Sequence, residues 1–167
     1  HLHLSEQDIG EFDTRCHVIP PLRSLTDRNG LRQGLTDGVI EAICSDHQPH
    51  GLDAKLAPFS ESSPGIAGLE TLLSLTLKLV DEGVLKLPEA VAALTANPAR
   101  ILGIDTGQLS IGARADLCVF DPTEQWQVDA GKLRSNGSNT PFDGQSLPGA
   151  VRWTLVSGEV VFAHDKE

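Results

Sequence analysis

The sequence lacks several features that would place it in common protein classes. No apolar run approaches the roughly 18–20 residues that a membrane-spanning helix needs, which argues against a transmembrane protein. No basic leader precedes an apolar segment, so no secretory signal is predicted. Cationic side chains are few, since 13 Lys and Arg stand against 23 Asp and Glu, and a net charge of −10 disfavours binding to a phosphate backbone. We therefore expect a cytoplasmic protein with no nucleic-acid and no membrane partner.

Cysteine, methionine and aromatic residues are also scarce. The three cysteines are widely spaced and form no Cys-x-x-Cys pair, so they predict neither a disulfide framework nor a zinc finger. Cys44 and Cys118 lie in apolar runs and are expected to be buried. Aromatic residues make up only 4%, which leaves the core to Leu, Val, Ile and Ala. Methionine is absent and the first residue is His1, so we expect a processed chain or a piece of a longer protein.

The residue pattern predicts an α/β region over residues 1–104 and an all-β region over residues 105–167. In the first region, apolar spacing and capping residues predict a buried strand at 39–44 and helices at 24–35, 65–83, 87–96 and 99–102. In the second, short apolar pieces between Gly and Pro predict strands at 107–112, 115–121, 126–128 and 151–162. We expect the last of these to form two strands joined by a turn at Ser157-Gly158.

A polar cluster follows directly after the predicted buried strand. Asp46, His47 and His50 lie within five residues, and functional groups of parallel α/β folds gather at the carboxyl ends of strands. An aspartate can bind a divalent metal and exchange a proton with its water, and His50 could donate a hydrogen bond to an anionic substrate. The same residue types are typical of a structural turn, so both interpretations stay open here. His1 and His3 have the spacing of a metal-binding His-x-His pair.

Several segments, taken in order, resemble the C-terminal part of dihydroorotases, which belong to the amidohydrolase superfamily. The Ser-Asp-His-Gln-Pro-His stretch at 45–50 resembles the family's Thr-Asp-His-Ala-Pro-His signature. Four further segments resemble family stretches: His-Leu-His-Leu at 1–4, Pro-Pro-Leu-Arg at 20–23, Gly-Ile-Ala-Gly-Leu-Glu at 65–70 and Asn-Pro-Ala at 97–99. The pieces at 115–121 and 154–161 resemble strands of the family's small β domain.

The resemblance implies a fold and an activity. The fold would be the C-terminal part of a TIM (β/α)8 barrel over 1–104, followed by part of a β-sandwich over 105–167. The N-terminal part of the same protein would complete both. The activity would be the zinc-dependent interconversion of N-carbamoyl-L-aspartate and L-dihydroorotate in pyrimidine biosynthesis. The resemblance further implies one or two zinc ions, other ligands upstream of this chain, a small-molecule substrate and a homo-oligomer.

The resemblance also assigns roles to individual residues. Asp46 matches a metal ligand that acts as general acid and base, while His50, Pro64 and Gly65 match substrate-binding positions. Ile19 departs from the family, which has an asparagine before Pro-Pro-Leu-Arg. Two alternatives follow: a noncatalytic dihydroorotase-like subunit that supports aspartate transcarbamoylase assembly, or an allantoinase or dihydropyrimidinase acting on another cyclic amide.

Overall fold

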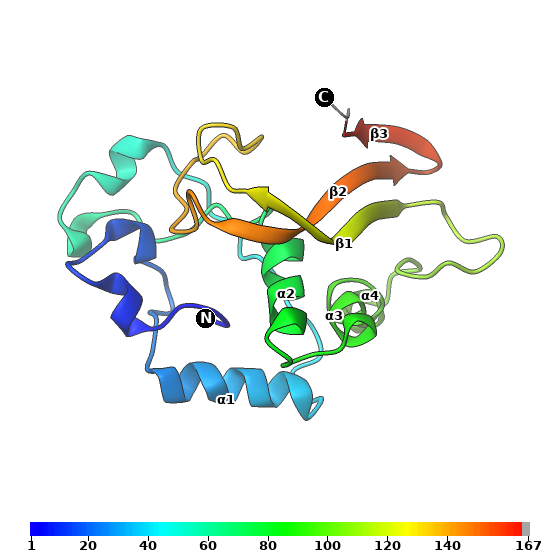
Figure 1. Ribbon diagram of the computed structural model, residues 1–167, viewed down its shortest axis with the longest axis horizontal. Coiled ribbons are helices and arrows are strands. Elements are labelled where there is room, and N and C mark those ends of the chain that lie inside the picture. Colours follow the sequence, from blue (N-terminus) through cyan, green and yellow to red (C-terminus); the bar gives the residue numbers. More distant parts are fainter. Residues whose placement is uncertain (165–167) are drawn as a thin grey trace.

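The computed structural model describes residues 1–164, which form helices followed by an antiparallel sheet. The α-helices are α1 (Leu25–Thr36), α2 (Leu72–Asp81), α3 (Leu87–Leu94) and α4 (Ala96–Leu102). Four short 3-10 helices are η1 (Glu6–Ile9), η2 (Thr14–Cys16), η3 (Leu52–Lys55) and η4 (Phe59–Glu61). The strands are β1 (Leu117–Gln127), β2 (Ser146–Val156) and β3 (Glu159–Ala163). In Figure 1, α2 stands between the sheet and α1.

Helix α1 confirms the helix predicted at 24–35. Ser24 caps it, because the Asp27 backbone N–H donates to Ser24 Oγ at 3.2 Å and the Asp27 carboxylate accepts from the Ser24 N–H at 3.1 Å. Two arginines of the helix donate to carbonyls of the first residues of the chain: Arg28 to His3 at 3.3 Å and Arg32 to Leu2 at 2.7 Å. Helix α1 therefore anchors the segment at 1–4.

The prediction of a strand at 39–44 is wrong. Residues 39–46 form no ladder, and the only bridge nearby is an isolated parallel pair between His47 and Ile66 among the described residues. The Ile43 N–H donates instead to the Ala93 carbonyl at 3.0 Å. The apolar run suits a strand, but no neighbouring strand within residues 1–164 pairs with it. Cys44, predicted to be buried, is exposed as a result.

The helix predicted at 65–83 begins seven residues later than expected. Residues 65–69 are not helical: Gly65 has a φ of 127°, and the backbone N–H groups of Ala67, Gly68 and Leu69 donate to the Asn139 carbonyl and to the His47 ring. Helix α2 therefore starts at Leu72 and ends at Asp81, before Gly83 with its φ of 71°.

Helices α3 and α4 pack together. Helix α3 carries a proline in its first turn and ends at Leu94, two residues before the predicted end. The chain turns at Thr95, and α4 begins at Ala96, so Asn97 and Pro98 lie in its first turn. A hydrophobic core unites α1, α2 and α3 through four buried residues: Leu35, Leu79, Leu85 and Ala90.

The C-terminal strands form one antiparallel sheet in the order β1-β2-β3. The turn at Ser157-Gly158 is confirmed, and both residues have positive φ, at 52° and 86°. The strand predicted at 107–112 does not form, and Cys118, expected to be buried, is exposed on β1. No second sheet lies against this one in the described part of the chain, so the β-sandwich stays a prediction.

Helix α2 packs against the sheet. The Trp126 indole N–H of β1 donates to Ser74 Oγ at 2.8 Å. Gly149 of β2, with φ of 95°, lies so close to the helix that a Cβ there would be 2.4 Å from Leu77 Cδ1. No helix in the described residues is long and apolar enough to span a membrane.

Candidate active site

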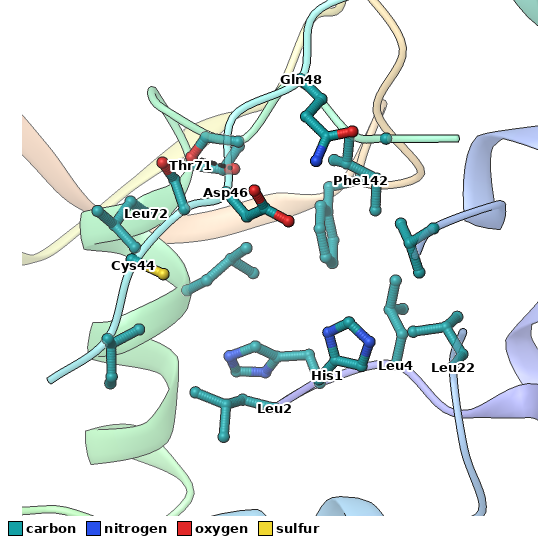
Figure 2. Close-up of a pocket in the computed structure, with 18 of the residues that line it drawn as sticks. His1, Leu2, Leu4, Leu22, Cys44, Asp46, Gln48, Thr71, Leu72 and Phe142 are labelled. Atoms are coloured by element: carbon teal, nitrogen blue, oxygen red, sulfur yellow. Dashed lines mark hydrogen bonds between the residues drawn. The ribbon is translucent and has the colours of Figure 1, made fainter. Parts of the chain in front are cut away.

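A cavity of about 380 Å³ lies beside α2. Five parts of the chain form its wall: the segment at 1–4, the turn at 18–22, the segment at 43–48, the residues from 65 to Leu79 of α2, and Phe142 between β1 and β2. Figure 2 shows Asp46 on one side of this cavity and His1 and Leu2 on the other. Of the predicted site residues, Asp46 and Gly65 line the cavity, whereas His50 and Pro64 do not.

Asp46 is the polar group best placed to act in the cavity. Its carboxylate projects into the open space in Figure 2, and the residue is exposed. Its backbone is in the left-handed region, with φ of 44°, a conformation that Asp and Asn adopt more readily than most residues. The backbone around it is held on both sides, by the bond from Ile43 to Ala93 and by the Gln48 N–H, which donates to the Ile66 carbonyl at 3.0 Å.

His47 faces away from the cavity and connects three segments. Its Nδ1 accepts the backbone N–H groups of Gly68 at 3.1 Å and Leu69 at 3.3 Å. Its Nε2 therefore carries the proton of the neutral ring and donates to Ser135 Oγ at 3.2 Å. Glu70 strengthens the same junction by accepting the backbone N–H groups of Arg134 and Ser135, each at 3.1 Å. His47 thus has the structural role that the sequence left open for this cluster.

The three predicted substrate-binding residues lie next to one another. His50 Nε2 and the Pro64 carbonyl form a hydrogen bond of 2.9 Å, which orients the imidazole. Gly65 follows with φ of 127°, and a Cβ there would lie 2.5 Å from the Gln48 Cβ. Glycine is required at this position because of both the backbone conformation and the close approach. The Gly65 N–H donates to the His17 carbonyl at 2.8 Å.

The opposite wall carries His1, His3 and Ile19. His1 Nε2 is bonded to the Pro20 carbonyl at 2.8 Å, and Ile19 is 66% exposed. His3 lies against the helices: burial, followed by the positive charge of Arg32, lowers its pKa to about 4. Its Nδ1 has no hydrogen-bond partner among the described residues. His3 is therefore neutral near pH 7.

The described residues do not by themselves form a metal site. Within residues 1–164, no three His, Cys, Asp or Glu side chains are grouped so that they could hold an ion. Catalytic zinc takes three protein ligands and leaves one position open. The Asp46 carboxylate could hold one such position, because it is a hard oxygen donor that faces open space.

The fold and this cavity define the class of protein. The model of the Amidohydrolase family matches residues 6–161, nearly the whole chain, so the chain belongs to the amidohydrolase family. Its curated relatives include the dihydroorotase of Geobacter metallireducens, which is 46% identical over 95% of this chain and 38% of its own length. A dihydroorotase-like protein of Pseudomonas putida is 47% identical over 95% of this chain and 37% of its own.

Solved structures agree with this assignment. An L-hydantoinase (dihydropyrimidinase) from Arthrobacter aurescens superposes with a TM-score of 0.89 at 32% identity, over 97% of this chain and 37% of its own. A D-hydantoinase from a Thermus species superposes with a TM-score of 0.87 at 25% identity, over 98% of this chain and 38% of its own. The α/β fold expected from the sequence is thus the fold of the corresponding part of cyclic amidohydrolases. The chain spans about 38% of the length of the curated relatives it matches.

Proposed function

We propose that the protein carrying this chain is a hydrolase of cyclic amides of the dihydroorotase type. It would interconvert N-carbamoyl-L-aspartate and L-dihydroorotate, and pyrimidine biosynthesis in the cytoplasm would be its setting. The observation that carries the proposal is the Asp46 carboxylate, which faces the cavity with Gly65 on the same wall. The similarity to curated dihydroorotases supports the same assignment.

Asp46 would move the proton in this reaction. In ring opening, its carboxylate would take a proton from the attacking water and deliver it to the leaving amide nitrogen. In ring closure, the same group would return the proton in the opposite direction. An exposed carboxylate at a fixed backbone turn suits this exchange, because it can reach both water and substrate without rearranging the chain.

One or two zinc ions would assist this chemistry. A bound zinc ion supplies Lewis acidity, which makes water a nucleophile near neutral pH. Asp46 would provide one ligand, and the other ligands would come from the part of the protein outside this chain. In the same scheme, residues 1–104 would contribute to a TIM barrel and residues 105–167 to a β-sandwich, in a homo-oligomer.

The substrate would be held by the part of the cavity wall that Gly65 lines. The backbone at Gly65 offers close approach to the ring, and His50 and Pro64, which do not line the cavity, would support Gly65 from behind that wall. His50 Nε2 donates to the Pro64 carbonyl, so Nδ1 could donate to a carboxylated ring only when the imidazole carries both protons. The similarity to curated dihydroorotases is what favours a substrate with a negative charge beside its cyclic amide.

A substrate panel tests the proposal. The full-length protein, supplied with zinc, would be assayed for ring opening of L-dihydroorotate, dihydrouracil and hydantoin. We expect a preference for L-dihydroorotate, because the other two rings carry no carboxylate. Faster opening of dihydrouracil or hydantoin would replace this assignment with a dihydropyrimidinase or hydantoinase, and no activity on any ring would contradict it.

A second candidate function is a noncatalytic subunit that supports assembly of aspartate transcarbamoylase. Ile19 on the cavity wall favours it, because an aliphatic side chain cannot donate or accept the hydrogen bonds of an amide. Co-purification with aspartate transcarbamoylase, together with no ring opening, would support this candidate, whereas independent migration would count against it.

A further inference from the structure

Asn139 is almost fully buried, at 2% exposure, in the connection between β1 and β2. Its side-chain amide donates to the Gln48 and Gly65 carbonyls, each at 2.9 Å. Its Oδ1 accepts the His50 N–H at 2.7 Å. One side chain therefore bonds three backbone groups in two segments that are 74 to 91 residues away from it.

The backbone around Asn139 reinforces this contact. The Asn139 carbonyl accepts the Ala67 N–H at 3.0 Å, and the Ser138 N–H donates to the His50 carbonyl at 3.2 Å. Gly137 packs closely against the same segment, because a Cβ there would be 2.3 Å from the backbone nitrogen of His50. Residues 137–139 thus form a clamp on the segments at 48–50 and 65–67.

The bonds of Asn139 are specific in direction. Both amide hydrogens point to carbonyls and the amide oxygen points to an N–H, so only a side chain with two donors and one acceptor at this length satisfies all three groups. Each of these groups would be left unpaired in a buried place if the amide were removed. Without it, the two segments keep the Gln48–Ile66 and His50–Pro64 hydrogen bonds between them, flanked by the bonds from Gly68 and Leu69 to the His47 ring.

We infer that Asn139 is a positioning residue for substrate binding: through Gly65 and His50 it sets the distance between the two segments that meet the substrate. It does not reach the cavity itself, since it is absent from the lining. This inference rests on the proposed function, because it takes the cyclic amide to be bound beside Gln48 and Gly65, which line the cavity. It goes beyond that function by assigning part of substrate affinity to a residue of the C-terminal region.

Two variants of the full-length protein test the inference. Asn139→Ala removes all three hydrogen bonds, and Asn139→Asp keeps the volume and the acceptor for His50 while placing an oxygen against two carbonyls. For L-dihydroorotate we expect the KM of both variants to rise about tenfold or more, because small misplacements of binding groups are costly. We expect kcat to change less than about threefold, since Asp46 is not bonded to the clamp.

Ser74→Ala is the matched control, because it also removes a buried hydrogen bond, the one to Trp126, without touching the two segments. Its KM should stay within about twofold of the wild type. A KM in the Asn139 variants that matches this control, or a loss confined to kcat, would overturn the positioning role.

Amide hydrogen exchange separates this inference from the proposed function. In Asn139→Ala, peptides covering 47–50 and 64–67 should lose protection, while Ser74→Ala should leave them unchanged. Unchanged exchange in Asn139→Ala would overturn the clamp whether or not the protein is active. If the wild type opens none of the three rings, the proposed function fails, and the role of the clamp in binding a cyclic amide fails with it.

Discussion

The segments around the cavity and the three-stranded sheet are stabilised in different ways. In the sheet, β1, β2 and β3 pair through antiparallel ladders that register shifts interrupt at three places. Around the cavity, the segment at 39–50 has a single isolated bridge, and the half-buried His47 and the buried Asn139 hold it in place. Polar side chains can thus hold a segment in place without regular secondary structure, because they satisfy its backbone groups.

The difference also explains which substitutions should matter. A ladder distributes its stability over many equivalent hydrogen bonds, so one exposed position contributes little. A segment held by a few buried side chains concentrates its stability, so one position can contribute much. The cavity segments should therefore be sensitive to single substitutions, and the outer hairpin of the sheet should be tolerant.

Gly137→Val should have the largest effect on stability. A Cβ at this position would lie 2.3 Å from the backbone nitrogen of His50, so a branched side chain must displace the backbone at 49–50. We expect the free energy of unfolding of the full-length protein to fall by about 3 kcal/mol, the upper part of the usual range for overpacking. Urea unfolding would measure it. The control is Gly131→Val, which lies in an exposed turn of the same connection between β1 and β2.

A loss below about 0.5 kcal/mol for Gly137→Val would break the comparison, because the clamp would then be as tolerant as the hairpin. A similar loss in the Gly131→Val control would do the same, since it would show that any connection between β1 and β2 is equally sensitive.

Acidification should destabilise the protein through His3. Burial is the first cause of its lowered pKa, Arg32 of α1 and Lys78 of α2 lower it further, and Glu82 opposes them. Because the pKa of His3 is about 4 in the folded protein and 6.5 for a histidine exposed to solvent, the unfolded state binds more protons between these values. Stability is then fully present above pH 6.5 and falls as the pH drops toward 4.

Between pH 7.5 and pH 5, this difference corresponds to a loss of at most about 2 kcal/mol. Unfolding of the wild type and of His3→Leu at both pH values would measure it, with the pH-dependent loss smaller in the variant. An equal loss in both proteins would show that other groups control the response to acid.

Ser157→Asn should have the smallest effect and the opposite sign. Both residues of the turn between β2 and β3 have positive φ, and Asn-Gly is the preferred pair for such a hairpin turn. We expect a gain of up to about 0.5 kcal/mol, the usual bound for surface changes. Thermal unfolding of the two proteins would detect it, and a loss of stability would contradict the turn geometry.

The sequence predicted the parts whose signals are local. The Ser24 cap of α1 and the Ser157-Gly158 turn depend on residues close together in the chain, and both are confirmed. The strand at 39–44 was wrongly predicted because its apolar run carries no information about a partner. The delayed start of α2 depends on His47 and Asn139, which lie far away in the sequence.

The candidate site was predictable to a similar extent. Asp46 stands out at the end of an apolar run, and its placement in the cavity wall agrees with that expectation. The roles of Asp46, His50, Pro64 and Gly65 stay predictions. Asn139 carries no local signal, because its three partners become neighbours only when the chain folds.

The rate of ring opening by Asp46→Asn is the most direct test of the central claim. Asparagine keeps the size of the side chain and tolerates the left-handed backbone at this position, but it cannot take up a proton. With the full-length protein and L-dihydroorotate, we predict that kcat falls about 10³-fold, within the range for general acid–base catalysis. Asp53→Asn, on an exposed 3-10 helix of the following loop, should keep kcat within about twofold. An Asp46→Asn protein that retains wild-type kcat would contradict the account.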